Sequence, residues 1–301
     1  MNGADSLAVV VAIEHGAGNV AQILAHLDPA AHADVDFIFC SPPGPDPLAD
    51  VGRLPPNVRC IRSAADARIP HMWRDGMLAA ATTWVGLLSA HCIPTRTWMV
   101  SARALAVEAA DAGIGGFLTN SDDANAIDWA IYLLRYVNYS RARAVTGCDN
   151  IAADNAIYRR SEVVAHADLI AQGFWEPEFH KRFFARGYRL RLSPELEVIH
   201  RNRYSAAAFV YQRREHGFAF GGDRARALGT GRLILYVLAA PLIPIVLFGK
   251  IRAGMRRYGW SSQVPRGTAF WLVYFILNWA VGEARGLVSQ LRLRHRRPSR
   301  P

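Results

Sequence analysis

The chain has 301 residues, of which 51% are hydrophobic, 20% charged and 10% aromatic. This composition excludes an intrinsically disordered chain and gives enough length for a catalytic domain with an appendage. The formal net charge of +10 is uneven, because arginine dominates from Arg182 onward. A basic C-terminal region favours an anionic membrane surface or nucleic acid as a partner.

The cysteines are widely spaced and form no CxxC pair. This spacing disfavours a disulfide framework or a zinc site, so we expect a reducing environment. The first apolar run, residues 7–13, is short and follows Asp5, so it predicts a strand and not a signal peptide. The four cysteines are Cys40, Cys60, Cys92 and Cys148.

Apolar runs alternate with helical periodicity through the first third of the chain. Nearly continuous apolar runs predict buried strands, and apolar residues three and four apart predict helices. The alternation predicts an α/β fold with a mostly parallel sheet flanked by helices. The predicted strands are 7–13, 35–40, 58–61 and 84–88, and the predicted helices are 20–27 and a helix within 68–81.

The same alternation continues, less regularly, up to residue 200. A glycine at 187 is suited to end the last helix. The Gly-x-Gly at 16–18 lacks a third glycine, so it is only a weak signal for a nicotinamide cofactor. Helices are predicted at 98–112, 127–139 and 179–186, and strands at 113–118, 188–192 and 196–200.

Two apolar runs lie in the C-terminal region, at 233–248 and 269–281, and a basic segment separates them. Each is shorter than the roughly 20 residues of a spanning helix. If both spanned, the basic segment and the basic tail would lie on opposite sides, against the positive-inside rule. We therefore predict a membrane-associated helical hairpin over residues 229–301, which either spans the membrane or dips into one leaflet.

Polar residues follow the predicted strands. Glu14 follows the first, Cys40 ends the second, and Ser89 and His91 follow the strand at 84–88. Ligands of open α/β sheets bind at the carboxyl ends of the strands. His91 and His200 together could bind a divalent metal, although either one alone is more simply a strand-end histidine bonded to the backbone.

Two further groups of side chains could carry chemistry. Glu176 and Glu178 flank a proline, and a carboxylate near an acceptor hydroxyl can act as a general base; alternatively, both are surface glutamates favoured by a helix dipole. Arg213 and Arg214 suit phosphate groups, and the alternative is a solvated basic face or contact with lipid headgroups.

The order and spacing of several segments over about residues 7–225 resemble the family 2 glycosyltransferases, which have the GT-A fold. Leu88–Pro94 falls where that family has Leu-Asp-x-Asp-x-x-Pro, and Gln212-Arg213-Arg214 is loosely similar to its Gln-x-x-Arg-Trp. The other similar segments are Arg74-Asp75-Gly76, Asn155–Arg160, Glu176-x-Glu178 with Arg182 and Gly187, and Val198-Ile199-His200.

The resemblance implies a GT-A-like domain at residues 1–228 that transfers a sugar, with inversion, from a nucleotide sugar. The implied acceptor is a lipid-linked or polysaccharide acceptor at the cytoplasmic face of the inner membrane, with no nucleic acid as partner. Glu176 or Glu178 would be the catalytic base. The donor side would comprise Glu14, Cys40, Arg74, Ser89, His91, Arg213 and Arg214, and the acceptor side Asp154, Asn155 and Trp175.

This sequence departs from the family pattern at the metal motif. Ser89 and His91 replace the two aspartates, and Cys40 stands where an aspartate usually contacts uracil. The implied cofactor is Mg or Mn, with His91 and His200 as its candidate ligands. The departures motivate an alternative, a catalytically weakened binding subunit of a polysaccharide-assembly complex. A basic binder without activity is less favoured, because aromatic and basic residues do not interleave in the domain.

Overall fold

The computed structural model describes residues 6–14, 18–108, 111–139, 148–202 and 204–296. The chain forms two compact units. The first comprises residues 1–122 and 138–203, and the second comprises 123–137 and 204–301. The predicted division at residues 228 and 229 stays a prediction.

The first unit is built on an eight-stranded sheet with the order β3-β2-β1-β4-β7-β6-β8-β5. The pairs among β3, β2, β1 and β4 are parallel, as is β6 with β8, whereas β7 and β5 run antiparallel to their neighbours. This confirms the predicted α/β class, with a mixed, mostly parallel sheet consistent with the GT-A fold. The strands are β1 (Leu7–Ala12), β2 (Asp36–Ser41), β3 (Val58–Arg62), β4 (Trp84–Ser89), β5 (Cys92–Pro94), β6 (Gly113–Asn120), β7 (Asn155–Arg159) and β8 (Leu190–His200).

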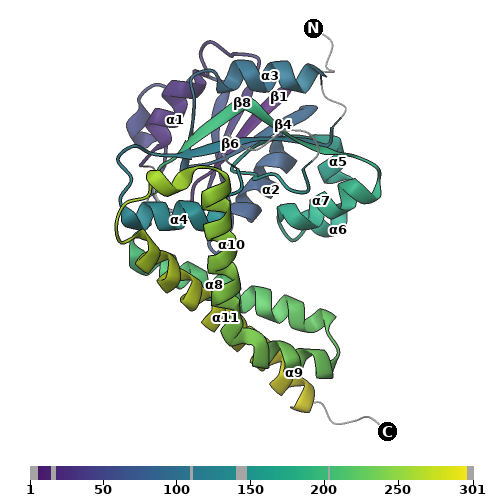
Figure 1. The fold of residues 1–301 in the computed structure, drawn as a ribbon. Helices are drawn as coiled ribbons and strands as arrows, with labels where there is room; N and C mark the ends of the chain where they lie inside the picture. The colour runs from purple at the N-terminus through teal and green to yellow at the C-terminus, as the bar shows by residue number, and fades with distance from the viewer. Residues whose placement is uncertain (1–5, 15–17, 109–110, 140–147, 203, 297–301) are drawn as a thin grey trace. The chain divides into compact units, whose positions relative to one another are not determined.

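Helices cover both faces of this sheet, with α1 and α3 on one face and α2 on the other (Figure 1). All six residues of β1 are therefore buried, as its apolar run predicts. Gly76 lets α2 pack closely on strands β1 and β2, because a Cβ at this position would meet the side chains of Val10 and Cys40. The helices of this unit are α1 (Val20–Leu27), α2 (Ile69–Ala79), α3 (Trp98–Glu108), α5 (Arg160–Val164), α6 (Ala167–Ile170) and α7 (Glu176–Ala185), with a short turn of 3₁₀-helix at Ala49–Val51.

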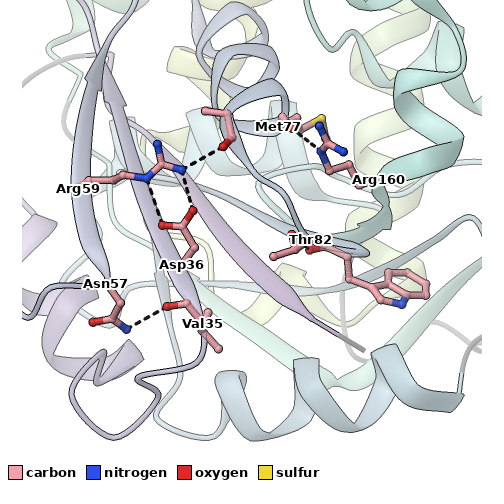
Figure 2. A network of polar contacts seen from close by, with 9 residues as sticks. Val35, Asp36, Asn57, Arg59, Met77, Thr82 and Arg160 are labelled. Carbon is pink, nitrogen blue, oxygen red and sulfur yellow. Dashed lines mark hydrogen bonds and ion pairs between the residues drawn. The ribbon is translucent and has the colours of Figure 1, made fainter. Parts of the chain in front are cut away.

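A polar network ties α2 to the sheet edge (Figure 2). Arg59 donates to both carboxylate oxygens of Asp36, at 3.2 and 2.7 Å, and to the Ala79 carbonyl at 3.1 Å. Arg160 donates to the Met77 carbonyl at 2.8 Å, which fixes the start of α5 against α2. Exposed ion pairs alone contribute little, so the bonds to the helix carbonyls matter most for placing α2.

Several predicted boundaries differ from the structure, and two of the differences have a clear physical reason. The strands predicted at 188–192 and 196–200 are one strand, β8, whose register with β6 shifts between Gly115 and Phe117. This irregularity lets the strand continue through Pro194, which is exposed. Helix α7 begins at Glu176 instead of Phe179, because proline and acidic residues are favoured in a first helical turn.

The second unit is helical. Its long helices α8 and α11 pack closely, because a Cβ at any of four glycines would meet the partner helix's backbone. This spacing, Gly-x-x-x-Gly on both helices, allows backbones to approach. The glycines are Gly217, Gly221, Gly282 and Gly286. The elements are α4 (Ala126–Tyr136), α8 (Ala206–Ala227), α9 (Thr230–Ala239), η3 (Ala240–Leu242), α10 (Ile243–Arg257), η4 (Trp260–Ser262) and α11 (Thr268–Arg296).

The first C-terminal apolar run is part of a continuous helical stretch, Thr230–Arg257, that passes through α9, η3 and α10. Pro241 and Pro244 fall in the first turns of η3 and α10, where proline is tolerated. The stretch has 28 residues and a mean hydropathy of 2.2 in its most apolar window, which is only 11% buried. Among the described residues, this stretch is the one helix that is long and apolar enough to cross a membrane.

Candidate functional site

The turn Ser89-Ala90-His91 joins β4 to β5 and is buried, with Ser89 0% and His91 2% exposed. Its backbone is held from two sides. The Ala90 amide donates to the Ala12 carbonyl at the end of β1, at 2.8 Å, and the His91 carbonyl accepts from the Arg201 amide at 2.7 Å. The turn therefore lies at the carboxyl ends of β1 and β4, where open α/β sheets bind ligands.

Asn19 is a third support for this turn, and the sequence analysis missed it. Its Nδ2 donates to the carbonyls of Ala90 at 2.8 Å and Arg201 at 3.2 Å, and the side chain is buried. An asparagine before a predicted helix signals an N-cap, but the Asn19 side chain makes no cap hydrogen bond to α1. It instead joins the start of α1 to two distant loops.

The strand register brings a second predicted segment to the same edge. Leu88 of β4 pairs with Asn155 of β7. Because these strands are antiparallel, the end of β4 at Ser89 lies beside the start of β7, which Asp154 directly precedes. Glu176 is directed to this segment, since its Oε1 accepts from the Ala153 amide at 3.3 Å. Ser89, Asp154 and Glu176 therefore belong to one edge of the sheet.

Glu178 has a different environment from Glu176. It forms an exposed ion pair with Lys181, with 2.6 Å between Oε1 and Nζ. Both glutamates lie in the first turn of α7, where the helix dipole favours an ionised carboxylate. Glu176 therefore contacts the loop before β7, whereas Glu178 pairs with Lys181 of its own helix.

Asn155 is completely buried, and its amide joins three parts of the fold. Nδ2 donates to the carbonyls of Phe117 at 2.9 Å and Leu196 at 3.1 Å, while Oδ1 accepts from the Trp98 indole at 2.7 Å. Its side chain fixes the start of β7. The other predicted acceptor-side residue, Trp175, is 37% exposed immediately before α7 and donates to the Gln172 carbonyl at 3.0 Å.

Two buried side chains, Tyr158 of β7 and His180 of α7, are in contact. The Tyr158 hydroxyl and His180 Nε2 are 3.0 Å apart, and His180 Nδ1 is 2.6 Å from Asn150 Oδ1. Burial lowers the pKa of His180 to about 4, so the imidazole is neutral at pH 7. Burial, and next the nearby Glu176 carboxylate, raise the pKa of Tyr158. Both groups stay uncharged and support α7 against β7.

Three further predicted donor residues belong to the first unit. The Cys40 thiol is buried beside Gly76, and burial raises its pKa so that it stays protonated. Arg74 is half-buried, pairs with Asp75 at 2.7 Å and donates to the Ala171 carbonyl at 3.3 Å. Glu14 is partly exposed just after β1.

The candidate metal ligands are two buried imidazoles. His200 of β8 lies opposite Cys92 of β5, and the Nδ1 of His200 is 3.2 Å from Asn120 Oδ1. Within the described part of the chain, no group of three or more His, Cys, Asp or Glu side chains could hold a metal ion. His91 and His200 therefore do not form a complete metal centre with the other described residues.

Arg213 and Arg214 belong to α8 in the second unit. Arg213 lies over the Phe209 ring at 5.0 Å, and its Nη2 is 3.0 Å from His216 Nδ1. Burial, and then the neighbouring Arg135 guanidinium, lower the pKa of Arg213 to about 9. Arg214 donates from Nε to Asn278 Oδ1 at 2.8 Å.

The chain matches no protein-family model and no curated protein. Among solved structures it is similar to a mycobacterial protein, with 12% identity, 70% of this chain and 72% of that chain covered, and a TM-score of 0.46. It is also similar to the mannosyltransferase PcManGT from Pyrobaculum calidifontis in complex with GDP-Man and Mn2+, with 11% identity, 97% and 88% coverage, and a TM-score of 0.47. At these scores the likenesses assign no function to this chain.

Proposed function

We propose that this protein is an inverting glycosyltransferase that takes a sugar from a nucleotide-sugar donor. The acceptor is a lipid-linked molecule or a growing polysaccharide at the cytoplasmic face of the inner membrane. The observation that carries the proposal is the buried turn Ser89-Ala90-His91, held at the carboxyl ends of β1 and β4 on the same edge as Glu176. The apolar stretch Thr230–Arg257 supports the membrane part of the proposal.

Glu176 is the proposed catalytic base. Its carboxylate takes the proton from an acceptor hydroxyl, and the oxygen attacks the anomeric carbon from the face opposite the nucleotide. The new C–O bond forms as the bond to the diphosphate breaks, and the nucleoside diphosphate leaves with the electron pair. Its growing negative charge needs fixed cations or hydrogen-bond donors, for which Arg74 is the proposed side chain of the first unit.

The remaining predicted residues have proposed roles around that step. Ser89 and His91 contact the donor at the turn, with Glu14 beside them. On the acceptor side, Asp154 and Trp175 are proposed to contact the acceptor. Asn155 is proposed as a positioning residue, because its amide bonds fix the start of β7.

The experiment is a panel of nucleotide sugars offered to the purified full chain, with and without Mg or Mn, with the released nucleoside diphosphate measured. We expect turnover of one donor and a product of inverted anomeric configuration by NMR. Turnover that is unchanged by a chelator and by His91→Ala would show that neither a divalent metal nor His91 takes part in the transfer. If a donor binds and no acceptor mixture gives turnover, the alternative of a binding subunit replaces the enzyme. Absence of both binding and turnover across the panel contradicts both.

A further inference from the structure

The second unit has an apolar outer surface that changes to a basic one along a single helix. Leu238, Leu242 and Ile245 of the α9–α10 stretch are 72%, 59% and 70% exposed. The last two turns of α10 carry several exposed cations instead. An apolar segment followed by Lys and Arg is typical of a helix that meets lipid headgroups at its basic end. These cations are Lys250, Arg252, Arg256 and Arg257.

Aromatic residues continue this pattern at the start of α11. Phe270 is 66% exposed and stacks on Tyr274, which is 40% exposed, with ring centroids 6.2 Å apart. Exposed aromatic rings beside cations are enriched at the membrane–water interface. The basic end of α10 and the first turns of α11 thus carry the chemistry of a headgroup layer.

A pocket of about 430 Å³ lies in this part of the unit, between α4, α10 and the start of α11. Its size is that of a small-ligand site. Apolar side chains form its body, and two arginines and two hydroxyls supply its polar groups. The apolar lining includes Leu133, Phe248, Met255, Val264 and Leu272, and the polar lining includes Arg252, Ser261, Arg266 and Thr268.

The polar groups of this pocket suit a phosphate. Arg252 and Arg266 are exposed and have no ion-pair partner among the described residues. Thr268 is 1% exposed, and its Oγ1 has no hydrogen-bond partner within the described part of the chain. Thr268 is also the first residue of the 29-residue helix α11, whose N-terminal dipole attracts an anion.

We propose that this pocket binds an anionic membrane lipid. The phosphate contacts Arg252, Arg266 and the Thr268 hydroxyl, and one apolar chain occupies the space between α4, α10 and α11. The proposal rests on the second unit alone, so it stands or fails independently of the proposed sugar transfer. It assigns the unit a specific lipid contact in addition to its apolar surface.

The test measures lipid binding to the detergent-solubilised full chain by native mass spectrometry. Phosphatidylglycerol, zwitterionic phosphatidylcholine and a polyprenyl phosphate are titrated separately. We expect both anionic lipids, or one of them, to bind at least about tenfold more tightly than phosphatidylcholine. All three lipids carry a phosphate, but Arg252 and Arg266 would repel the choline cation of phosphatidylcholine. Preference for the polyprenyl phosphate would identify the ligand as a lipid carrier, and preference for phosphatidylglycerol as a bilayer lipid.

Two variants with equal charge loss separate the pocket from general attraction. Arg252→Gln with Arg266→Gln should lower affinity for the anionic lipid by about tenfold or more. Lys250→Gln with Arg256→Gln removes two exposed cations of α10 outside the pocket and should change affinity less than about threefold. Equal losses in the two double variants, or equal binding of anionic and zwitterionic lipids, would overturn the proposal.

A third variant tests the apolar part without touching the arginines. Ala269→Trp places a bulky ring at an exposed wall of the pocket. It should abolish lipid retention and leave the circular dichroism spectrum and unfolding midpoint unchanged. Normal retention by a folded Ala269→Trp protein would also overturn the proposal, because the chain would then lie outside the pocket.

Discussion

Replacing Asn19 by alanine should both destabilise the first unit and disorganise the proposed donor site. The change removes the Nδ2 donor from two carbonyls, those of Ala90 at 2.8 Å and Arg201 at 3.2 Å. Each buried carbonyl left without a donor costs about 1–3 kcal/mol. Because the second bond is longer and only partly buried, we expect a total loss of about 2–4 kcal/mol in the free energy of unfolding.

The matched control is Asn57→Ala. Asn57 also donates to several carbonyls, those of Pro29, His32 and Val35, at 2.9–3.0 Å, but it does so in the loop before β3. Urea denaturation should show a similar loss of stability for both variants. Isothermal titration with the donor should show weakened binding for Asn19→Ala alone. Equal donor affinity in the two variants would refute the inference that Asn19 organises the turn Ser89-Ala90-His91.

Two further predictions concern close packing and pH. Gly221→Ala should destabilise the α8–α11 pair by about 1–3 kcal/mol, since its Cβ would meet the Glu283 carbonyl, whereas Gly222→Ala, facing open space, should be neutral or stabilising in thermal unfolding. Because the pKa of His180 falls to about 4 on folding, its contribution to stability is present above pH 6.5 and is lost as the pH falls through about 4. The expected loss is about 3 kcal/mol between these limits, measured by urea unfolding at several pH values; a slope that is unchanged in His180→Gln would contradict it.

Much of the fold follows from local patterns in the sequence. The buried strands β1, β2 and β4 are continuous apolar runs, and α1 was predicted with its observed bounds, Val20–Leu27, because four apolar residues repeat at helical spacing. Strand β7 was not predicted as a strand. It has only five residues, and its antiparallel position between β4 and β6 depends on pairings with distant segments.

The candidate site was predictable only in part, for the same reason. Ser89 directly follows the predicted strand at 84–88, and Glu176 shortly precedes the predicted helix at 179–186. Asn19, however, acts on carbonyls 71 and 182 residues away in the sequence, and no local pattern encodes such partners. The continuity of β8 through Pro194 likewise depends on a register shift in the neighbouring strand β6.

The comparison of Glu176→Gln with Glu178→Gln tests the central claim most directly. Both changes remove one negative charge from the first turn of α7, but only Glu176 contacts the Ala153 amide, and Glu178 pairs with Lys181. In donor-turnover assays at saturating substrate, Glu176→Gln should lower kcat by about 10²–10⁴-fold with donor affinity retained, as expected for a general base. Glu178→Gln should keep kcat within about threefold, as loss of an exposed ion pair implies. Full activity in Glu176→Gln, or a larger loss in Glu178→Gln, would contradict the proposed mechanism.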